Sequence, residues 1–253
     1  MLLPRVMPCL LIENEGLVKT VKFKNPSYVG DPINAIKIYN EKEVDELILL
    51  DIKATVEKRV PPFQLISEVT SECFMPLCFG GGVRHIDDMK KIFGMGVEKI
   101  SINSYAHENP TFIREASRYF GSQSIVVSID VKKTFSGKYI IRTHGGQRAT
   151  KSDPVTFARE MEKMGAGEIL LNSIDRDGQW NGYDLKLLEL VCSAVDIPVI
   201  ALGGAGNTTH FGKAVTNAGA SAVAAGSMVV YQGKGLGVLI NFPTRDELIK
   251  ALR

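Results

Sequence analysis

Two short glycine-containing segments in the second half of the sequence have the residue types of an anion site. A Gly-Gly pair follows the apolar run 198–202, and a Gly-Ser pair follows the apolar run 221–225. Glycine directly after a strand lets backbone N–H groups approach an anion closely, where a following helix favours negative charge. The alternative is that these glycines only satisfy turn geometry. The pattern predicts that a phosphate is bound by Gly203, Gly204, Gly226 and Ser227.

The first half of the chain repeats this arrangement. Residues 76–104 align with residues 198–227 at an offset of 122 to 123 positions, and residues 46–51 align with 168–173 at an offset of 122. The repeat indicates a duplicated half-structure. It also predicts a second phosphate site, formed by Gly81, Gly82, Asn103 and Ser104. Two such sites facing each other suit an elongated ligand with a phosphate at each end.

Acidic and basic side chains at the ends of other apolar runs are candidates for proton transfer. Asp130 closes the run 124–130, where an unpaired carboxylate is costly unless it points into a wet site. Apolar surroundings can raise the pKa of such a carboxyl group and make it a general acid or base. The predicted catalytic set is Asp130, Lys19, Asp51 and Asp177. For the aspartates other than Asp130, capping of a helix or loop is the alternative role.

The elements that must position these residues alternate regularly between strand and helix. Continuously apolar runs such as 46–51, 124–130 and 167–173 are typical of parallel strands that are covered on both faces. Helical stripes lie between them, for example over 152–164 and 184–195. Eight β/α units without a linker predict that residues 1–253 form a single (β/α)8 TIM barrel built from two half-barrels. Hairpins are expected over 12–23 and 131–143.

Composition restricts the partners and the location of this chain. The 253 residues carry a net charge of +2, so nothing in the balance predicts binding to nucleic acid or to a membrane surface. The N-terminal segment lacks the features of a signal peptide, and the chain is expected to be cytoplasmic. The four cysteines, Cys9, Cys73, Cys78 and Cys192, have no metal-ligand or redox spacing, so neither a metal nor another cofactor is expected.

Four charged residues at the opposite, N-terminal ends of the strands could form a closed ring at the barrel floor. They are Arg5, Glu46, Lys99 and Glu168. Residues on the N-terminal face of a barrel usually contribute to stability. Desolvation, however, offsets much of the Coulomb energy of such a ring. We therefore interpret the ring as a gate.

These motifs resemble the cyclase subunit of imidazole glycerol phosphate synthase over nearly the whole chain. The specific matches include residues 55–59, 80–82, 99–103, 173–178 and 203–206. The resemblance implies a barrel that receives ammonia from a glutaminase subunit docked on its floor. The ammonia would pass the charged ring and reach a bis-phosphorylated substrate at the mouth. It also implies that aspartates at the ends of the first and fifth strands act as acid and base.

One position departs from that pattern. Asp130 occupies the fifth-strand position, but Leu11 stands at the first-strand position, and leucine cannot transfer a proton. Segments 16–23, 30–35, 231–233 and 238–243 resemble instead a paralogous branch. That branch accompanies a glutaminase in the amidination of N-acetyl sugars for surface glycans, and its barrel hands ammonia to a separate sugar amidotransferase.

Three functions remain open from the sequence. The first is an ammonia conduit of the sugar-amidination branch, which binds partners more than it catalyses. The second is a cyclase of histidine biosynthesis with a displaced acid, either Asp175 or Asp177. The third is a phosphoribosyl isomerase of the same half-barrel fold, which needs acids on the first and fifth strands and has no use for the floor ring.

Overall fold

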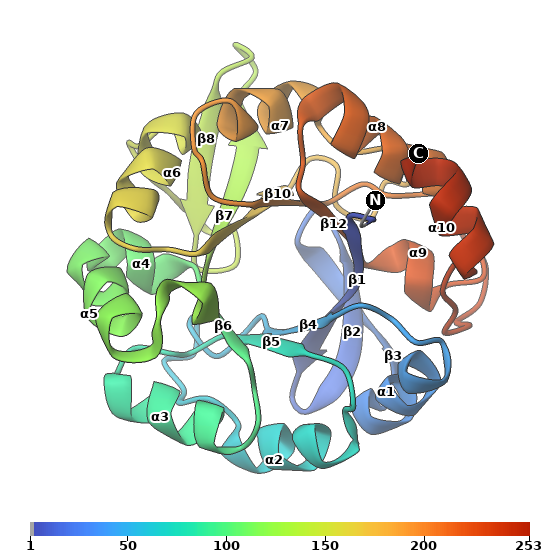
Figure 1. Ribbon diagram of the computed structural model, residues 1–253, viewed down its shortest axis with the longest axis horizontal. Helices are drawn as coiled ribbons and strands as arrows, with labels where there is room; N and C mark the ends of the chain where they lie inside the picture. The colour runs from blue at the N-terminus through green and yellow to red at the C-terminus, as the bar shows by residue number, and fades with distance from the viewer. Residues whose placement is uncertain (1–2) are drawn as a thin grey trace.

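The computed structural model describes residues 3–253, which form one closed barrel of eight parallel strands surrounded by helices (Figure 1). The barrel strands follow the order of the chain, and pairing of the first with the last strand and of β7 with β10 closes the cylinder. The predicted (β/α)8 barrel is confirmed. The barrel strands are β1 (Arg5–Glu13), β4 (Leu47–Asp51), β5 (Leu77–Gly80), β6 (Lys99–Ile102), β7 (Ile125–Lys133), β10 (Glu168–Ser173), β11 (Val199–Leu202) and β12 (Ala222–Ala225).

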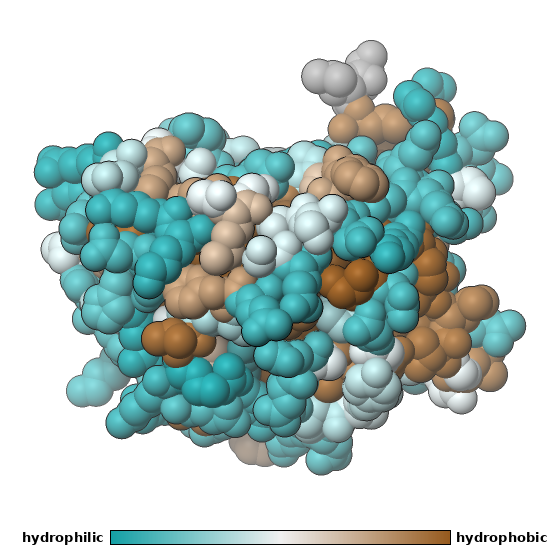
Figure 2. Space-filling model, turned by 90° about the horizontal axis from the view of Figure 1, so that it is seen from below, coloured by the Kyte–Doolittle hydropathy of each residue, from teal (hydrophilic) through white to brown (hydrophobic). Residues whose placement is uncertain are grey.

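Helices cover the outside of the barrel, and most coincide with the predicted stripes. Their outward sides are mainly hydrophilic in Figure 2, with a hydrophobic area at the right edge of that view. The longer helices are α1 (Pro32–Glu41), α2 (Phe63–Glu72), α3 (Ile86–Gly94), α5 (Pro110–Phe120), α6 (Pro154–Lys163), α7 (Leu185–Cys192), α8 (Thr208–Ala218) and α10 (Arg245–Leu252). The shorter ones are α4 (Ser104–Glu108), α9 (Ser227–Val230) and the 3-10 turn η1 (Ser122–Ser124). None of the helices in residues 3–253 is long and apolar enough to cross a membrane.

Two antiparallel extensions grow from the first strand of each half. Strand β1 turns at Asn14 and Glu15, both at positive φ, into β2 (Gly16–Val21). Strand β7 turns near Gly137 into β8 (Tyr139–Thr143). These are the two predicted hairpins. Each hairpin gains a further strand that the sequence did not indicate, β3 (Lys24–Gly30) and β9 (Arg148–Ala149).

Alternation along the strands separates two apolar cores. Val6, Leu10 and Ile12 of β1 face outward and join the large core between the sheet and the helices. Met7 and Cys9 face inward and join a second, smaller cluster inside the barrel. Because side chains on a strand point alternately to opposite faces, each strand contributes to both cores. The inner cluster also contains Ile48, Cys78, Val126, Leu170, Ile200, Leu202, Ala222 and Ala224.

Candidate functional site

A pocket lies at the C-terminal ends of the barrel strands, and it contains both predicted phosphate loops. The two halves of the chain contribute equivalent groups to its wall, as the repeat requires. Its lining includes Gly81, Gly82, Asn103 and Ser104 from the first half, and Gly203, Gly204, Gly226 and Ser227 from the second. The structure thus places these residues around one pocket, and their binding of phosphate stays a prediction.

The backbone of these loops needs glycine at particular positions. Gly81 has φ +119°, and a Cβ atom there would lie 2.5 Å from the carbonyl oxygen of Asp51. Gly204 has φ +111°, and a Cβ atom there would overlap the carbonyl oxygen of Gly182. Positive φ with no space for a Cβ atom excludes other residues. The glycines therefore have a geometric role, whether or not an anion binds.

Each half also has a short helix that the sequence pattern did not reveal. It follows β6 in the first half and β12 in the second. Helix α4 begins directly after Asn103, and α9 begins directly after Gly226. The two helices occupy equivalent positions in the two halves. They are too short to produce a periodic apolar stripe, and this is why sequence patterning missed them.

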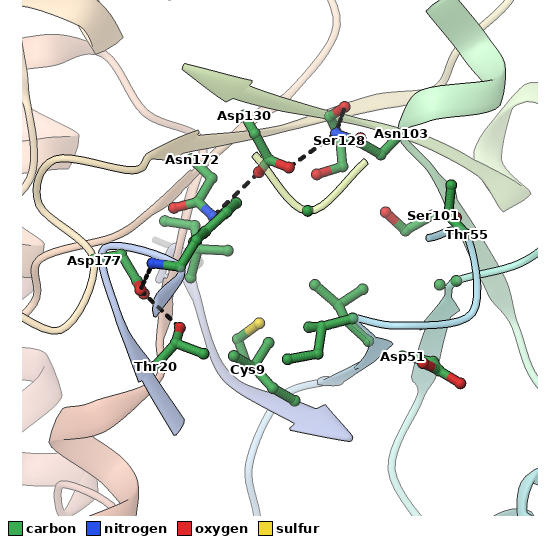
Figure 3. Close-up of a pocket in the computed structure, with 18 of the residues that line it drawn as sticks. Cys9, Thr20, Asp51, Thr55, Ser101, Asn103, Ser128, Asp130, Asn172 and Asp177 are labelled. Atoms are coloured by element: carbon green, nitrogen blue, oxygen red, sulfur yellow. Dashed lines mark hydrogen bonds between the residues drawn. The ribbon is translucent and has the colours of Figure 1, made fainter. Parts of the chain in front are cut away.

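Asp130 lies in this pocket (Figure 3), but β7 continues past it to Lys133, because residues 130–133 pair with β8. Its carboxylate accepts hydrogen bonds from the side-chain amides of Asn103, at 3.1 Å, and Asn172, at 3.2 Å. Burial raises the pKa of Asp130 to about 7, although the two amide bonds act in the opposite direction. The carboxyl group can therefore exchange a proton near neutral pH.

Leu11 lies at the corresponding point of β1 and also lines the pocket. Its side chain packs against the inner apolar cluster together with Leu50. The pocket thus has a titratable group on β7 and an aliphatic group at the equivalent position of β1.

Lys19 and Asp177 both line the pocket, but they face different neighbours. The Lys19 ammonium group is buried, donates to the carbonyl oxygen of Cys9 at 2.6 Å, and lies 3.0 Å from where a Cβ atom on Gly226 would be. It is therefore adjacent to the predicted phosphate loop that contains Gly226 and Ser227. Burial lowers the pKa of Lys19 and raises the pKa of Asp177, whose carboxylate accepts a bond from Thr20 Oγ1 at 3.0 Å.

Asp51 has the structural surroundings of a loop cap. Its Oδ1 accepts hydrogen bonds from the backbone N–H groups of Lys53 and Ala54, both at 2.9 Å, and Arg59 forms an ion pair with Oδ2 at 3.2 Å. Figure 3 shows its carboxylate turned away from the centre of the pocket. Asp175 caps a different backbone group, the N–H of Lys133 at 2.7 Å. The capping alternative thus describes these two carboxylates better than proton transfer does.

Some residues around Asp130 were not among the predicted site residues. Asn172 is buried, its amide nitrogen holds Asp130, and its Oδ1 has no hydrogen-bond partner in the described chain. Ser128 lines the same wall. Arg84 reaches the pocket from the loop before α3. A polar residue at the end of an apolar strand was the available signal for Asn172, as it was for Asp130.

At the opposite end of the barrel, the four predicted floor residues form a closed ring of ion pairs. Arg5 contacts Glu46 at 2.5 Å and Glu168 at 2.6 Å, and Lys99 contacts the same two carboxylates at 2.9 and 3.1 Å. Coulomb attraction to both glutamates raises the pKa of Arg5 against the opposing effect of burial. Every charge in the ring therefore has two partners of opposite sign. Residues 3–253 contain no group of three or more His, Cys, Asp or Glu side chains arranged to hold a metal ion.

The fold and the site define a (β/α)8 barrel with a charged floor ring, an apolar interior and a polar pocket at the mouth. Residues 5–235 match the sequence pattern of a family described as histidine biosynthesis protein. The chain belongs to this family, within the group of cyclase-type subunits of imidazole glycerol phosphate synthase.

The relatives are similar over almost their full length. A protein of Pseudomonas aeruginosa, provisionally named imidazole glycerol phosphate synthase subunit hisF2, is 52% identical over 96% of this chain and 97% of its own. A provisionally named HisF subunit of Leptospira interrogans is 46% identical over 98% of both chains. A hisF3 subunit of Vibrio vulnificus, named in the same way, is 46% identical over 100% of this chain and 97% of its own. The predicted resemblance to the cyclase family is confirmed, and the sugar-amidination branch stays a prediction.

Proposed function

We propose that this barrel conducts ammonia from a glutaminase subunit bound at its floor to its mouth, for the amidination of an N-acetyl sugar by a separate amidotransferase. One contrast carries the proposal. The floor ring is complete, whereas at the mouth Asp130 has no second acid opposite it, because Leu11 stands at that position. Desolvation offsets much of the Coulomb energy of a buried ring, so passage or docking of a molecule at the floor gives the ring a role beyond stability. The missing acid removes the proton transfer on which ring closure by a cyclase depends.

The floor ring supports the passage of a small neutral molecule. The ring covers the bottom of the apolar interior, since Arg5 and Glu168 precede Met7 and Leu170 on their strands and Glu46 directly precedes β4. If one side chain swings out, its two partners each keep one opposite charge. Opening therefore costs less than breaking an isolated buried pair, which leaves an uncompensated charge.

The interior above the ring favours ammonia over ammonium. It is lined by apolar and sulfur-containing side chains such as Met7, Cys9 and Cys78. Burial raises the pKa of the Cys9 thiol to about 12 and that of Cys78 also well above its usual value, so both remain neutral. A charged ion would lose its hydration there without compensation, whereas neutral ammonia would lose little.

A reconstitution experiment tests this function. The barrel is mixed with a glutaminase and the N-acetyl sugar amidotransferase of the same organism, and formation of the acetamidino sugar from glutamine is measured. With glutamine as the nitrogen source, we expect product only when all three proteins are present. With ammonium salt, we expect the amidotransferase to make product without the barrel. Full glutamine-driven activity in the absence of the barrel would contradict the proposal.

A second candidate is the cyclase reaction with Asp177 as the displaced acid. Asp177 lines the pocket with Asp130, and burial raises the pKa of both carboxyl groups. Purified barrel given the bis-phosphorylated cyclase substrate and ammonium salt distinguishes the two functions. Rapid formation of imidazole glycerol phosphate that is lost in Asp177→Asn would establish the cyclase, and we expect negligible turnover.

A further inference from the structure

The hairpin of the second half has an unusual charge. Residues 131–152 contain six lysines and arginines and no aspartate or glutamate: Lys132, Lys133, Lys138, Arg142, Arg148 and Lys151. The whole chain carries only +2, so the remainder of the molecule is net negative. All of the excess positive charge is thus concentrated in one structural element, formed by the end of β7 with β8 and β9.

This basic hairpin connects the mouth of the barrel with the outside of the helical ring. Gly145 and Gln147, in its last turn, line the pocket. Its other turn projects beyond the outline of the helices at the top of Figure 1. Phe135 lies in that turn and is fully exposed, with a relative accessibility of 114%. A fully exposed aromatic side chain therefore lies in a turn flanked by lysines.

Hydrogen bonds to the barrel hold the hairpin in place. The N–H of Lys133 donates to Asp175 at 2.7 Å, and the N–H of His144 donates to Ser104 Oγ at 2.8 Å. None of its six basic side chains forms a salt bridge within residues 3–253. The surface is consequently both fixed and unneutralised, as preorganised docking surfaces are.

We propose that the basic hairpin docks an acidic surface patch of the enzyme that takes up ammonia at the mouth, with Phe135 inserted into an apolar pocket of that enzyme. The proposal rests on the proposed function, since it identifies the surface that such a partner uses. Neutral ammonia leaving an open mouth would be lost to solvent, so the accepting site has to cover the pocket. Exposed aromatic residues with neighbouring arginines and lysines match the anchors and charged rim of protein interfaces.

The charge distribution favours a protein patch over nucleic acid. A long polyanion bound to the hairpin would extend over the remaining, net negative surface, which would repel it. An acidic patch of limited size would meet only the hairpin. The first hairpin offers a natural contrast, because it carries Glu13 and Glu15 besides its lysines, whereas the basic hairpin carries no acidic residue.

Binding of the purified N-acetyl sugar amidotransferase of the same organism to the barrel–glutaminase complex tests this assignment. The Kd is measured at 50 and 300 mM NaCl for the wild type, Lys133→Glu/Lys138→Glu and Phe135→Ala. We expect the double reversal to raise Kd at least tenfold at low salt and to flatten its salt dependence. Phe135→Ala is expected to raise Kd at least fivefold at both salt concentrations.

The matched control is Lys22→Glu/Lys24→Glu, which makes the same change in charge on the other hairpin, also at exposed positions. We expect its Kd to stay within twofold of the wild type. An unchanged Kd in both hairpin variants, or equal weakening in the control, overturns the docking assignment but leaves the proposed function intact. Failure of the wild type to bind the amidotransferase refutes both.

Two other occupants of the hairpin are tested with the same variants. Binding of a 30-base-pair DNA duplex by the wild type that is lost in Lys133→Glu/Lys138→Glu would assign the hairpin to nucleic acid. A wild-type dimer in light scattering that becomes a monomer in Phe135→Ala would assign it to a second copy of the chain. Either result would overturn the proposal.

Discussion

The floor and the mouth of this barrel differ in how completely they keep their polar groups. At the floor, Arg5 and Lys99 each contact both Glu46 and Glu168, so the ring is closed. At the mouth, Asp130 keeps its two amide partners, but the equivalent strand end presents Leu11. The two ends lie on the same strands, and yet the floor has a closed set of charged partners while the mouth has a carboxylate on β7 and an aliphatic side chain on β1.

This difference separates transport from catalysis. A gate needs alternating charges around an opening, and all four members of the ring are present. Acid–base chemistry needs a proton donor and an acceptor on opposite sides of the substrate, and one aliphatic replacement removes it. The comparison supports the proposed function, in which the barrel passes ammonia and does not itself carry out the cyclase reaction at its mouth.

The largest expected effect comes from restoring the acid at the mouth. Leu11→Asp should raise the rate of imidazole glycerol phosphate formation from the bis-phosphorylated substrate and ammonium salt by ~10² to 10⁴ over the wild type. The reason is that the new carboxylate enters the pocket that already contains Asp130. Product is measured by chromatography.

Leu11→Asn is the matched control for that change, because asparagine has the same shape but cannot transfer a proton. We expect it to remain as inactive as the wild type. Equal gains in the two variants would show that polarity at this position, and not proton transfer, limits the reaction. Robust turnover by the unmodified protein would remove the distinction between floor and mouth altogether.

Breaking the floor ring should lower stability. In Lys99→Met, Glu46 and Glu168 lose one of their two partners while their side chains stay only 4% and 11% exposed. We expect the free energy of unfolding to fall by more than about 1 kcal/mol, but by less than the roughly 3 to 5 kcal/mol of an isolated buried pair that loses one member, because Arg5 still contacts both glutamates. Urea denaturation measures this loss.

Lys37→Met provides the comparison with an exposed pair. Lys37 contacts Glu72 at 3.5 Å, and the two side chains are 52% and 40% exposed. Solvent screening should limit its effect to under about 1 kcal/mol. If Lys99→Met is equally mild, the ring carries little electrostatic energy and its role as a gate has to be reconsidered.

Asp130 should make stability depend on pH. Its folded pKa of about 7 exceeds the usual value of 3.8, so the folded state binds the proton more tightly than the unfolded state does. The contribution of Asp130 therefore weakens as pH rises from about 4 to 7, by about 1.4 kcal/mol for each pH unit. Asp130→Asn should stabilise the protein at pH 8 relative to the wild type, and this gain should shrink towards pH 4.5.

Thermal unfolding across this range measures the effect, with Asp175→Asn, at a half-buried backbone-capping position, for comparison. A gain from Asp130→Asn that does not vary with pH would show that burial does not govern the titration of Asp130.

The smallest expected effect comes from removing one serine hydroxyl from each predicted phosphate loop. Ser227 lines the pocket, and its hydroxyl makes no hydrogen bond within residues 3–253, whereas Ser104 Oγ already bonds Asn103 and the N–H of His144. Ser227→Ala should weaken binding of inorganic phosphate by about 1 kcal/mol, or roughly fivefold in Kd, without a change in melting temperature. Ser104→Ala should lower the melting temperature. Calorimetry that finds no phosphate binding in the wild type would show that the loops are turns only.

The sequence by itself determined the barrel and its repeat. Continuous apolar runs such as 46–51 and 167–173 mark strands covered on both faces, and their regular alternation with helical stripes leaves a closed barrel as the simplest arrangement. The floor ring was also predictable, because the first residue of a barrel strand must lie at the floor. These are properties of local pattern and of strand direction.

Only the tertiary structure decided what each polar side chain contacts at the mouth. Asp130 meets Asn103 and Asn172, which are 27 and 42 residues away, and Asp51 turns to its own loop although both aspartates follow an apolar run of a barrel strand. Lys19 reaches the predicted phosphate loop at Gly226 because its hairpin folds back over the barrel. Barrel closure and loop conformation set these contacts, and neither is encoded in the spacing of residues along one strand. For this reason, residue type identified the candidates, while folding assigned their partners.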